Sequence, residues 1–222
     1  MQVGAPLGEP FLYTHRSGVY FNSRAPSQPT DGVEGAQTHL PCAYALLRRL
    51  LPQEDAAALW EQTISRPAEP TAVPTVRTFN KSHEAFGRRY PALVAGVLAL
   101  KEAFGRSLSL PADELDRVGI TDIRCVRYGE GAECPWHRDD PRAHFVVVVL
   151  LSDPHLDFEG GRMVVHPGEC ADDADAMPLD LEQGDALIYA APRLDTAMQR
   201  VSEGDRVACV FELGLPRAQA WE

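Results

Sequence analysis

The sequence has little positive charge and no long apolar run. Its 222 residues include 21 lysines and arginines against 32 aspartates and glutamates, a formal net charge of −11. A protein that binds DNA or RNA through the phosphates needs an excess of basic side chains, so we expect no nucleic-acid partner. The longest uncharged apolar stretch, residues 143–152, is about half as long as a membrane-spanning helix requires. We therefore expect no membrane partner either.

The sequence also lacks a secretory signal and a disulfide or zinc pattern. Its amino terminus, MQVGAPLGEPFLYTHRSG, has neither a basic start followed by an apolar run nor a small-residue cleavage site, so we expect a cytoplasmic location. The cysteines are odd in number, widely spaced and without a CxxC pair, which fits neither a disulfide framework nor a zinc ribbon. We expect buried thiols at Cys42, Cys125, Cys134, Cys170 and Cys209.

Helical patterns are concentrated in the first half of the chain. Residues 1–37 are rich in proline, glycine, serine and threonine with little apolar periodicity, and we expect an irregular amino-terminal arm there. Apolar residues recur at spacings of three and four over residues 39–51 and 55–64, which predicts two helices. A third helix is predicted over 91–104, because proline stands in its first turn and glycine follows its end. A short acidic turn or helix follows at 113–117.

The second half of the chain changes to brief β-rich runs separated by glycine, proline and aspartate. Five strands are predicted, over residues 123–128, 145–151, 162–166, 186–189 and 206–213. Helices followed by many short strands favour a helical layer packed on a β-sandwich or barrel over alternating βαβ units. We therefore expect a single α+β, mainly β domain over residues 38–222, with a helical part at 38–118 and a β core at 119–215.

The segment from Tyr128 to Asp139, YGEGAECPWHRD, carries recognisable chemistry. In an extended chain His137 and Asp139, two residues apart, point to the same side and can approach one ion. An imidazole and a carboxylate are also two of the three ligands in the 2-His-1-carboxylate face that holds Fe(II). Alone, a histidine and an aspartate at this spacing are a weak signal, since exposed loop residues produce the same pattern.

Further short motifs surround this pair in a recognisable order. Gly131 follows the strand that Tyr128 closes, and the apolar run FVVVVLL follows the His-Asp pair. The remaining motifs, each before a predicted strand, are Gly160–Gly161, Gly184–Asp185 and Gly204–Asp205–Arg206. This order, over residues 123–213, resembles the prolyl-4-hydroxylase-like branch of the 2-oxoglutarate and Fe(II)-dependent oxygenases.

The resemblance implies a double-stranded β-helix, or jelly roll, with the amino-terminal helices packed on one sheet. It implies that His137 and Asp139 are iron ligands. It also implies that Arg206 pairs with the distal carboxylate of 2-oxoglutarate and that Tyr128 donates its hydroxyl to this cosubstrate. The chemistry of Arg206 agrees, since a planar guanidinium binds a carboxylate through two hydrogen bonds. The alternatives are a surface arginine in a turn and, for Tyr128, a core aromatic at a strand end.

The implied function is that of a dioxygenase that uses Fe(II), 2-oxoglutarate and O₂ to hydroxylate or oxidatively modify a substrate, releasing succinate and CO₂. A small molecule and a peptidyl side chain fit the sequence equally well as substrates. Both a homo-oligomer and a hetero-oligomer are compatible with it.

The sequence departs from the family pattern at the second histidine. The family spacing from Arg206 places this ligand at Thr196, and no histidine follows His166 in the chain. A hydroxyl is a poor ligand beside imidazole, so three alternatives stay open. A one-residue bulge brings the Asp195 carboxylate to the metal, His166 reaches the metal from its strand end, or nothing replaces the histidine. In the last case the protein is a degenerate, non-redox jelly roll that acts as a binding or scaffolding subunit.

Overall fold

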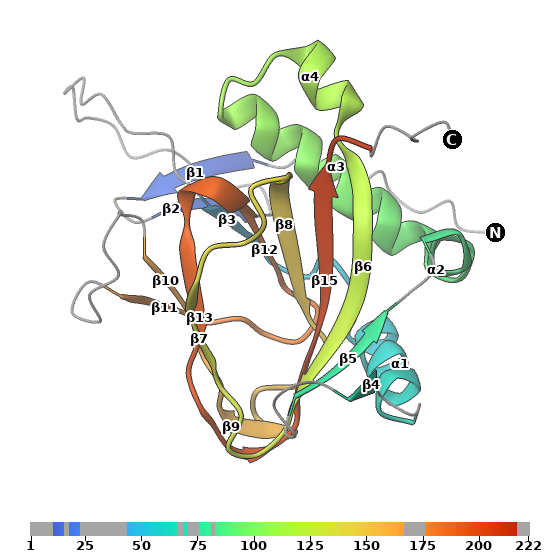
Figure 1. Cartoon of the computed structure of the whole chain (residues 1–222), viewed down its shortest axis with the longest axis vertical. Helices are drawn as coiled ribbons and strands as arrows, with labels where there is room; N and C mark the ends of the chain where they lie inside the picture. Colours follow the sequence, from blue (N-terminus) through green and yellow to red (C-terminus); the bar gives the residue numbers. More distant parts are fainter. Residues whose placement is uncertain are drawn as a thin grey trace.

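A computed structural model describes residues 11–15, 18–22, 44–65, 69–70, 76–80, 83–166 and 176–216 of the chain, and its strands form three sheets (Figure 1). The largest sheet has nine strands, in the order β1 (Phe11–His15), β2 (Gly18–Asn22), β3 (Tyr44–Leu47), β12 (Ala186–Ala190), β8 (Ala143–Leu150), β15 (Arg206–Gly214), β6 (Gly119–Tyr128), β5 (Val76–Asn80) and β4 (Glu69–Pro70). The second sheet has four, in the order β11 (Met177–Leu179), β10 (Met163–His166), β13 (Asp195–Met198) and β7 (Cys134–His137). The third pairs β14 (Val201–Gly204) with β9 (Phe158–Gly160). Apart from the parallel pair of β2 and β3, the described strand pairs are antiparallel.

The central strand β8 of the nine-stranded sheet is covered on both faces. In β8, Phe145, Val147 and Val149 pack with helical side chains in a first hydrophobic core. Val146 and Val148, which alternate with them, pack in a second core between the two larger sheets. Successive side chains of a strand point to opposite faces, so this strand is apolar throughout because both faces are covered.

Helices cover the outer face of this sheet. They are α1 (Gln53–Ile64), α2 (His83–Arg89), α3 (Pro91–Ser107) and α4 (Ala112–Arg117). A short 3-10 helix, Ala191–Arg193, follows β12, and its Ala191 is buried in the second core. Figure 1 shows α1, α2 and α3 on the side of the nine-stranded sheet that faces away from β7 and β13. The predicted layer of helices packed on one sheet is therefore confirmed, as are the helices predicted over 55–64, 91–104 and 113–117.

Helix α3 shows why its sequence forms a helix and where the prediction of its end was inexact. Leu93, Val97, Leu100 and Phe104 recur every three or four residues and are buried in the first core. The glycine at position 105 lies inside the last turn, and the helix ends at Ser107. A Cβ atom there would lie 2.5 Å from Leu115 Cδ1, so glycine lets α4 pack closely against α3.

The predicted helix over residues 39–51 is wrong. Within that stretch the structure describes residues 44–51, and Tyr44–Leu47 forms β3, which pairs with β12 and β2. Tyr44 and Leu46 face the second core, whereas Ala45 faces the first. A short strand buried on both faces is apolar at every position, so its sequence also matches a helical stripe. Pairing with strands that are distant in sequence decides between the two structures.

The five predicted strands are confirmed as β6, β8, β10, β12 and β15, with small shifts at their ends. In the predicted arm, residues 1–37, the structure describes a hairpin of β1 and β2 at the edge of the large sheet. The rest of the arm lies outside the described residues, and the division of the chain at residue 37 stays a prediction. None of the described helices combines the length and the apolar composition needed to cross a membrane.

Candidate active site

Strands β7 and β13 bring His137 and Thr196 together on one face of the four-stranded sheet. Thr196 pairs directly with His137, and Met198 pairs with Cys134. Residues directly opposite each other in an antiparallel pair point to the same face of a sheet. All four side chains line one cavity of about 100 Å³.

The imidazole of His137 is oriented by the backbone of its own strand. Its Nδ1 lies 3.0 Å from the carbonyl oxygen of Pro135 and 3.5 Å from Cys134 Sγ. The contact with Cys134 and the hydrogen bond to Pro135 raise the pKa of His137 to about 9, against the opposing effect of partial burial. An Nδ1–H group that donates to a backbone carbonyl is the usual arrangement of a metal-binding histidine, because it leaves Nε2 for the metal.

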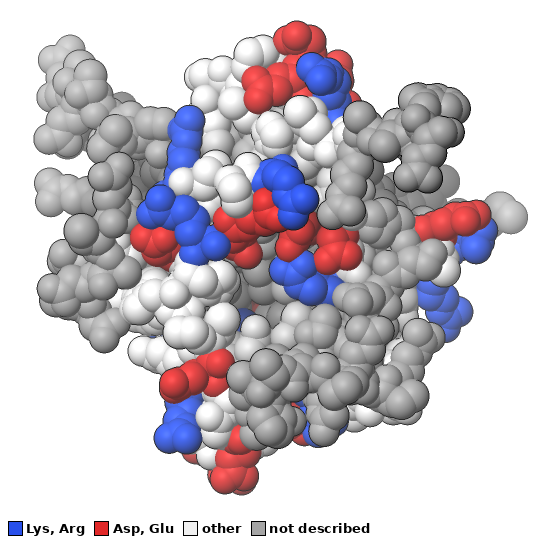
Figure 2. All heavy atoms as spheres, viewed as in Figure 1, with Lys and Arg blue, Asp and Glu red and all other residues white. Residues whose placement is uncertain are grey.

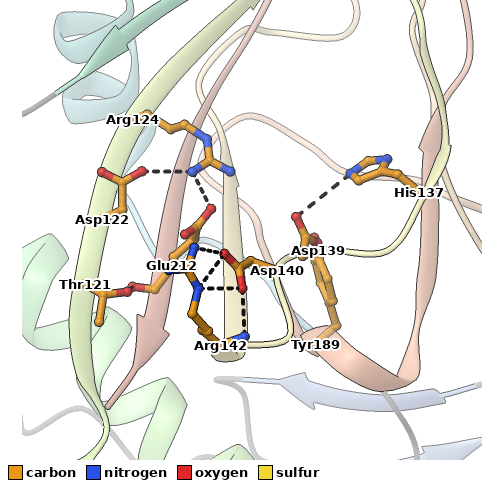
Figure 3. Close-up of polar contacts among 9 residues, drawn as sticks. All are labelled: Thr121, Asp122, Arg124, His137, Asp139, Asp140, Arg142, Tyr189 and Glu212. Carbon is orange, nitrogen blue, oxygen red and sulfur yellow. Dashed lines mark hydrogen bonds and ion pairs between the residues drawn. The ribbon is translucent and has the colours of Figure 1, made fainter. Parts of the chain in front are cut away.

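Asp139 lies beside Nε2 of His137. Its Oδ1 is 3.9 Å from His137 Nε2 (Figure 3). Two ligand atoms about 2.0–2.2 Å from one ion can lie no more than roughly 4.4 Å apart, so this pair fits a single metal ion.

Tyr189 holds the other oxygen of this carboxylate. From β12, its hydroxyl donates a hydrogen bond of 2.5 Å to Asp139 Oδ2 (Figure 3). The phenol also interacts with the side-chain hydroxyl of Thr196. Burial and the negative charge of Asp139 raise the pKa of Tyr189 well above its usual value of 10, so the phenol keeps its proton.

Arg206 lies in the same cavity, next to Tyr128. The two residues are directly paired across β15 and β6, and both line the cavity together with His137 and Asp139. Burial raises the pKa of Tyr128 to about 12, and a hydrogen bond with Cys134 contributes in the same direction. The structure thus brings four of the predicted site residues to one place.

The side chain of Arg206 is buried, and it has no counter-ion in the part of the chain that the structure describes. The residue is 4% exposed, and no carboxylate of the described residues forms an ion pair with it. Burial lowers the pKa of Arg206. Negative charge on Tyr128 or Cys134 acts in the opposite direction and raises this pKa. Buried charges in proteins are normally paired, so this cation indicates a bound anion.

Gly161, from the predicted Gly-Gly motif, makes room for this arginine. Its φ of +57° lies in the left-handed region that favours glycine. A Cβ atom at this position would lie 3.1 Å from Arg206 Cδ and 3.0 Å from Val201 Cγ2. The motif therefore has a physical role in placing the arginine side chain.

The structure does not bring Asp195 to the His-Asp pair. Its carboxylate accepts two hydrogen bonds from Arg138, of 2.8 and 2.9 Å. Asp195 precedes Thr196, so its side chain points to the other face of β13. The irregularity in this strand lies between Thr196 and Met198, beyond the position where a bulge would turn Asp195 inward. The predicted third ligand is thus engaged elsewhere.

His166 also lies on the other face of the four-stranded sheet. It pairs with Asp195 across β10 and β13, and its ring packs edge-on against Trp136. Within the described residues, no group of three or more His, Cys, Asp or Glu side chains is arranged to hold a metal. The site therefore offers two such ligands, His137 and Asp139, and the hydroxyls of Thr196 and Tyr189.

The sequence analysis missed the places of Cys134 and Tyr189 in this cavity. Cys134 was expected to be buried, but it is half-buried and lines the cavity, whereas Cys125 and Cys209 are buried as predicted. The other two cysteines lie outside the described residues. Tyr189 gave no signal, because a tyrosine in a buried β-strand is ordinarily a core residue. Its contact with Asp139 forms because β12 and the loop after β7, which are distant in the sequence, lie side by side in the structure.

Paired charges surround a larger hollow near this cavity. Arg124, which lines the cavity, forms ion pairs with Asp122 and Glu212, and Arg142 forms one with Asp140 (Figure 3). A hollow of about 880 Å³ is lined by the other four residues of these pairs, Asp122, Asp140, Arg142 and Glu212. Figure 2 shows acidic and basic side chains side by side across the middle of this face. The surroundings of the cavity are therefore polar.

No protein-family model and no curated protein sequence matches the chain. Solved structures nevertheless resemble it. HygX from Streptomyces hygroscopicus, with nickel, 2-oxoglutarate and hygromycin B bound, has a TM-score of 0.62 at 12% identity over 81% of this chain and 86% of that chain. EvdO2 from Micromonospora carbonacea var. aurantiaca, complexed with 2-oxoglutarate, has a TM-score of 0.58 at 16% identity over 81% and 89%. A prolyl-4-hydroxylase from Pseudomonas putida has a TM-score of 0.57 at 16% identity over 78% and 93%.

These similarities extend over most of both chains in each pair. At 12% to 16% identity they show a common fold. The chain therefore has the fold of solved 2-oxoglutarate-binding proteins and of a prolyl hydroxylase, while its activity has to be argued from its own residues.

Proposed function

We propose that the protein is a 2-oxoglutarate- and Fe(II)-dependent dioxygenase with a jelly-roll fold. The observation that carries this proposal is that Arg206 is buried, without an ion-pair partner among the described residues, in the same cavity as His137 and Asp139. A cation in this setting binds an anion, and the neighbouring imidazole and carboxylate bind a metal. A ligand that is both an anion and a metal chelator satisfies the whole cavity, and 2-oxoglutarate has both properties.

Arg206 and Tyr128 would bind the distal carboxylate of the cosubstrate. The guanidinium supplies a pair of parallel donors that match a carboxylate, and burial makes each charged hydrogen bond stronger than it would be in water. Tyr128 keeps its proton, since its pKa is raised to about 12, and a neutral phenol can donate to the same carboxylate. Together these groups fix one end of the ligand and direct the other toward His137 and Asp139.

His137 and Asp139 would hold Fe(II), which supplies the oxidation chemistry with O₂. The protein's part is to fix these ligands. Pro135 holds the His137 ring through Nδ1, and Tyr189 holds Asp139 through Oδ2. The small cavity also limits the water that can reach the reacting atoms.

The proposed substrate is a polar small molecule or peptidyl side chain that approaches through the hollow beside Arg124. The carboxylates of Asp122 and Glu212 and the guanidinium of Arg142 line this hollow and supply hydrogen-bond partners of both kinds. A structure of HygX, which shares this fold, has hygromycin B bound together with nickel and 2-oxoglutarate, which supports a small-molecule ligand. We also propose a cytoplasmic location. Because the net charge of the chain is −11, we propose that it has no nucleic-acid partner.

A second function is favoured by Thr196. It stands opposite His137, where the resemblance places the second histidine, and a threonine hydroxyl binds metal poorly. In that case the protein is a degenerate, non-redox jelly roll that binds a 2-oxo acid or another dicarboxylate as a binding or scaffolding subunit. Arg206 and Tyr128 would act in the same way, and the His-Asp pair would have no redox role.

The test combines calorimetry with a turnover assay. The parent protein is titrated with 2-oxoglutarate in the absence and presence of Mn(II) under nitrogen, and is then supplied with Fe(II) and O₂ while succinate is measured. Metal-enhanced binding with succinate release supports the dioxygenase. Metal-independent binding without succinate supports the binding subunit. If 2-oxoglutarate does not bind under either condition, both proposals are wrong.

A further inference from the structure

Tyr189 connects the two large sheets at the proposed metal site. It belongs to β12 of the nine-stranded sheet and is 2% exposed. Its hydroxyl donates to Asp139 Oδ2 at 2.5 Å, while Asp139 Oδ1 lies 3.9 Å from His137 Nε2 (Figure 3). One carboxylate oxygen is thus held by the phenol, and the other lies beside the imidazole.

The carboxylate of Asp139 needs such a restraint. His137 is the last residue of β7, so Asp139 lies beyond the strand and its backbone is not held by the sheet. The torsion that turns the carboxylate of an aspartate is broad and lacks three sharp staggered minima. A hydrogen bond from a buried donor on a central strand therefore fixes which oxygen lies beside His137.

Thr196 supports the donor from the opposite sheet. It is 1% exposed and lies opposite His137, and it lines the same cavity as Tyr189. The side chain at the position expected for a second imidazole therefore lies in the cavity that also holds the phenol. From there Tyr189 extends to the carboxylate through its hydrogen bond.

We propose that Tyr189 is a positioning residue for Asp139, and that Thr196 acts on the same carboxylate through Tyr189. This inference rests on the proposed function, because it assigns both hydroxyls to the metal site of that function. It differs from a direct role of Tyr189 as a ligand, in which the phenol loses its proton and its oxygen binds the metal. It also differs from a purely structural role, in which the hydrogen bond stabilises the fold alone.

The experiment is a set of Mn(II) titrations at a temperature where every variant is folded, as checked by circular dichroism. Loss of an outer group that orients a metal ligand weakens metal binding roughly 10–100-fold, and we expect this for Tyr189→Phe. The matched control is Tyr90→Phe, which removes a phenol that donates a 2.7 Å hydrogen bond to Gln62 away from the site. We expect parent-like Mn(II) affinity for this control. Equal affinities of Tyr189→Phe and the parent would overturn the proposal.

A double-mutant cycle tests the part assigned to Thr196. Thr196→Val keeps the shape of the side chain and removes its hydroxyl, and we expect weaker Mn(II) binding than in the parent. In the Tyr189→Phe background the same substitution should have no further effect, because Thr196 acts through the phenol. Additive effects would refute this linkage. Thr63→Val, at a buried threonine that donates to a helical carbonyl, is the control, and if Tyr189→Phe does not fold, Thr196→Val tests the proposal alone.

Two further outcomes are distinguishable. A phenolate bound to Fe(III) gives an intense visible charge-transfer band, so such a band in the parent that is absent from Tyr189→Phe would show a ligand and overturn the positioning role. A parent that binds no Mn(II) would contradict the proposed metal site itself, and the inference with it. If the parent binds Mn(II) and Tyr189→Phe binds it with equal affinity, the proposed function stands and the inference alone is refuted.

Discussion

Thr196 lies directly opposite His137 in the antiparallel pair of β13 and β7. Both side chains point into the same cavity, so position 196 is where a second imidazole would meet the first. The neighbouring position carries Asp195, which faces Arg138 on the other side of the sheet. Successive side chains of β13 point to opposite faces of the sheet. Position 196 therefore faces the cavity and can be converted into a ligand, whereas position 195 faces away from it and cannot.

The first prediction concerns Thr196→His. This substitution should complete a face of two imidazoles and one carboxylate and raise Mn(II) or Fe(II) affinity by at least ~10-fold, judged from the effect of lesser groups around metal sites. Because the Tyr189 hydroxyl contacts Thr196, the variant Thr196→His/Tyr189→Phe provides room for the ring if the single variant is crowded. Metal titration measures both. The single variant is compared with the parent and the double variant with Tyr189→Phe, and unchanged affinity in both comparisons would show that position 196 does not face the metal.

The second prediction contrasts two aspartates. Asp139→Ala should remove most of the metal affinity, as should His137→Ala, because each leaves one firmly placed ligand. Asp195→Ala should leave metal affinity unchanged, because its carboxylate is bound to Arg138. The cost to stability of losing this half-exposed ion pair should be at most about 1 kcal/mol. If Asp195→Ala weakens metal binding as much as Asp139→Ala, the placement of Asp195 on the outer face is wrong.

The third prediction concerns Arg206→Gln. We expect loss of 2-oxoglutarate binding, equivalent to about 2–5 kcal/mol for a desolvated charge pair, measured by calorimetry in the presence of Mn(II). The melting temperature without ligand should not fall, because the variant removes a buried cation that has no counter-ion among the described residues. Arg127→Gln is the control. That arginine binds Asp205 on the opposite face of β6 through hydrogen bonds of 2.8 and 2.7 Å, and 2-oxoglutarate affinity should be retained.

The fourth prediction uses a pair of glycines. Gly161→Ala should weaken 2-oxoglutarate binding, because its Cβ meets the Arg206 side chain and the backbone has a positive φ. It should also destabilise the fold by about 1 kcal/mol or more. Gly87→Ala lies in α2 with no atom within 4 Å of the added Cβ, so it should be stabilising by roughly 0.5–1 kcal/mol and leave binding unchanged. Equal 2-oxoglutarate affinities in the two variants would contradict the role of Gly161.

Long elements with one dominant pattern could be predicted from the sequence. Helix α3 has apolar residues on one face and a proline at its start, and β8 is a run of valines between turns. Both patterns depend on residues close together in the chain. Strand β3 could not be predicted, because its partners β12 and β2 are set by packing distant in the sequence. Strand β7 contains Pro135, and proline is unfavourable within a sheet except at an edge.

The site was predictable in part for the same reason. The spacing of His137 and Asp139 and the glycines before Arg206 are local features, and the structure brings His137, Asp139 and Arg206 to one cavity. The partner of Asp195 and the contact of Tyr189 with Asp139 depend on which face of a strand meets which neighbour. The sequence therefore could not reveal that the carboxylate next to the expected ligand position binds Arg138, and a tyrosine with no motif of its own was overlooked.

The position of β7 at the end of its sheet has a consequence for motion. Within the described part of the chain β7 pairs with β13 alone, whereas β8 is flanked by β12 and β15. Opening of an outer strand breaks one set of backbone hydrogen bonds, and opening of a central strand breaks two and exposes two cores. Amide hydrogens around His137 should therefore exchange with solvent much faster than those of β8. A bound ion that ties β7 to the loop carrying Asp139 would slow this exchange, so the occupancy of the site would be visible in the amide exchange of a single strand.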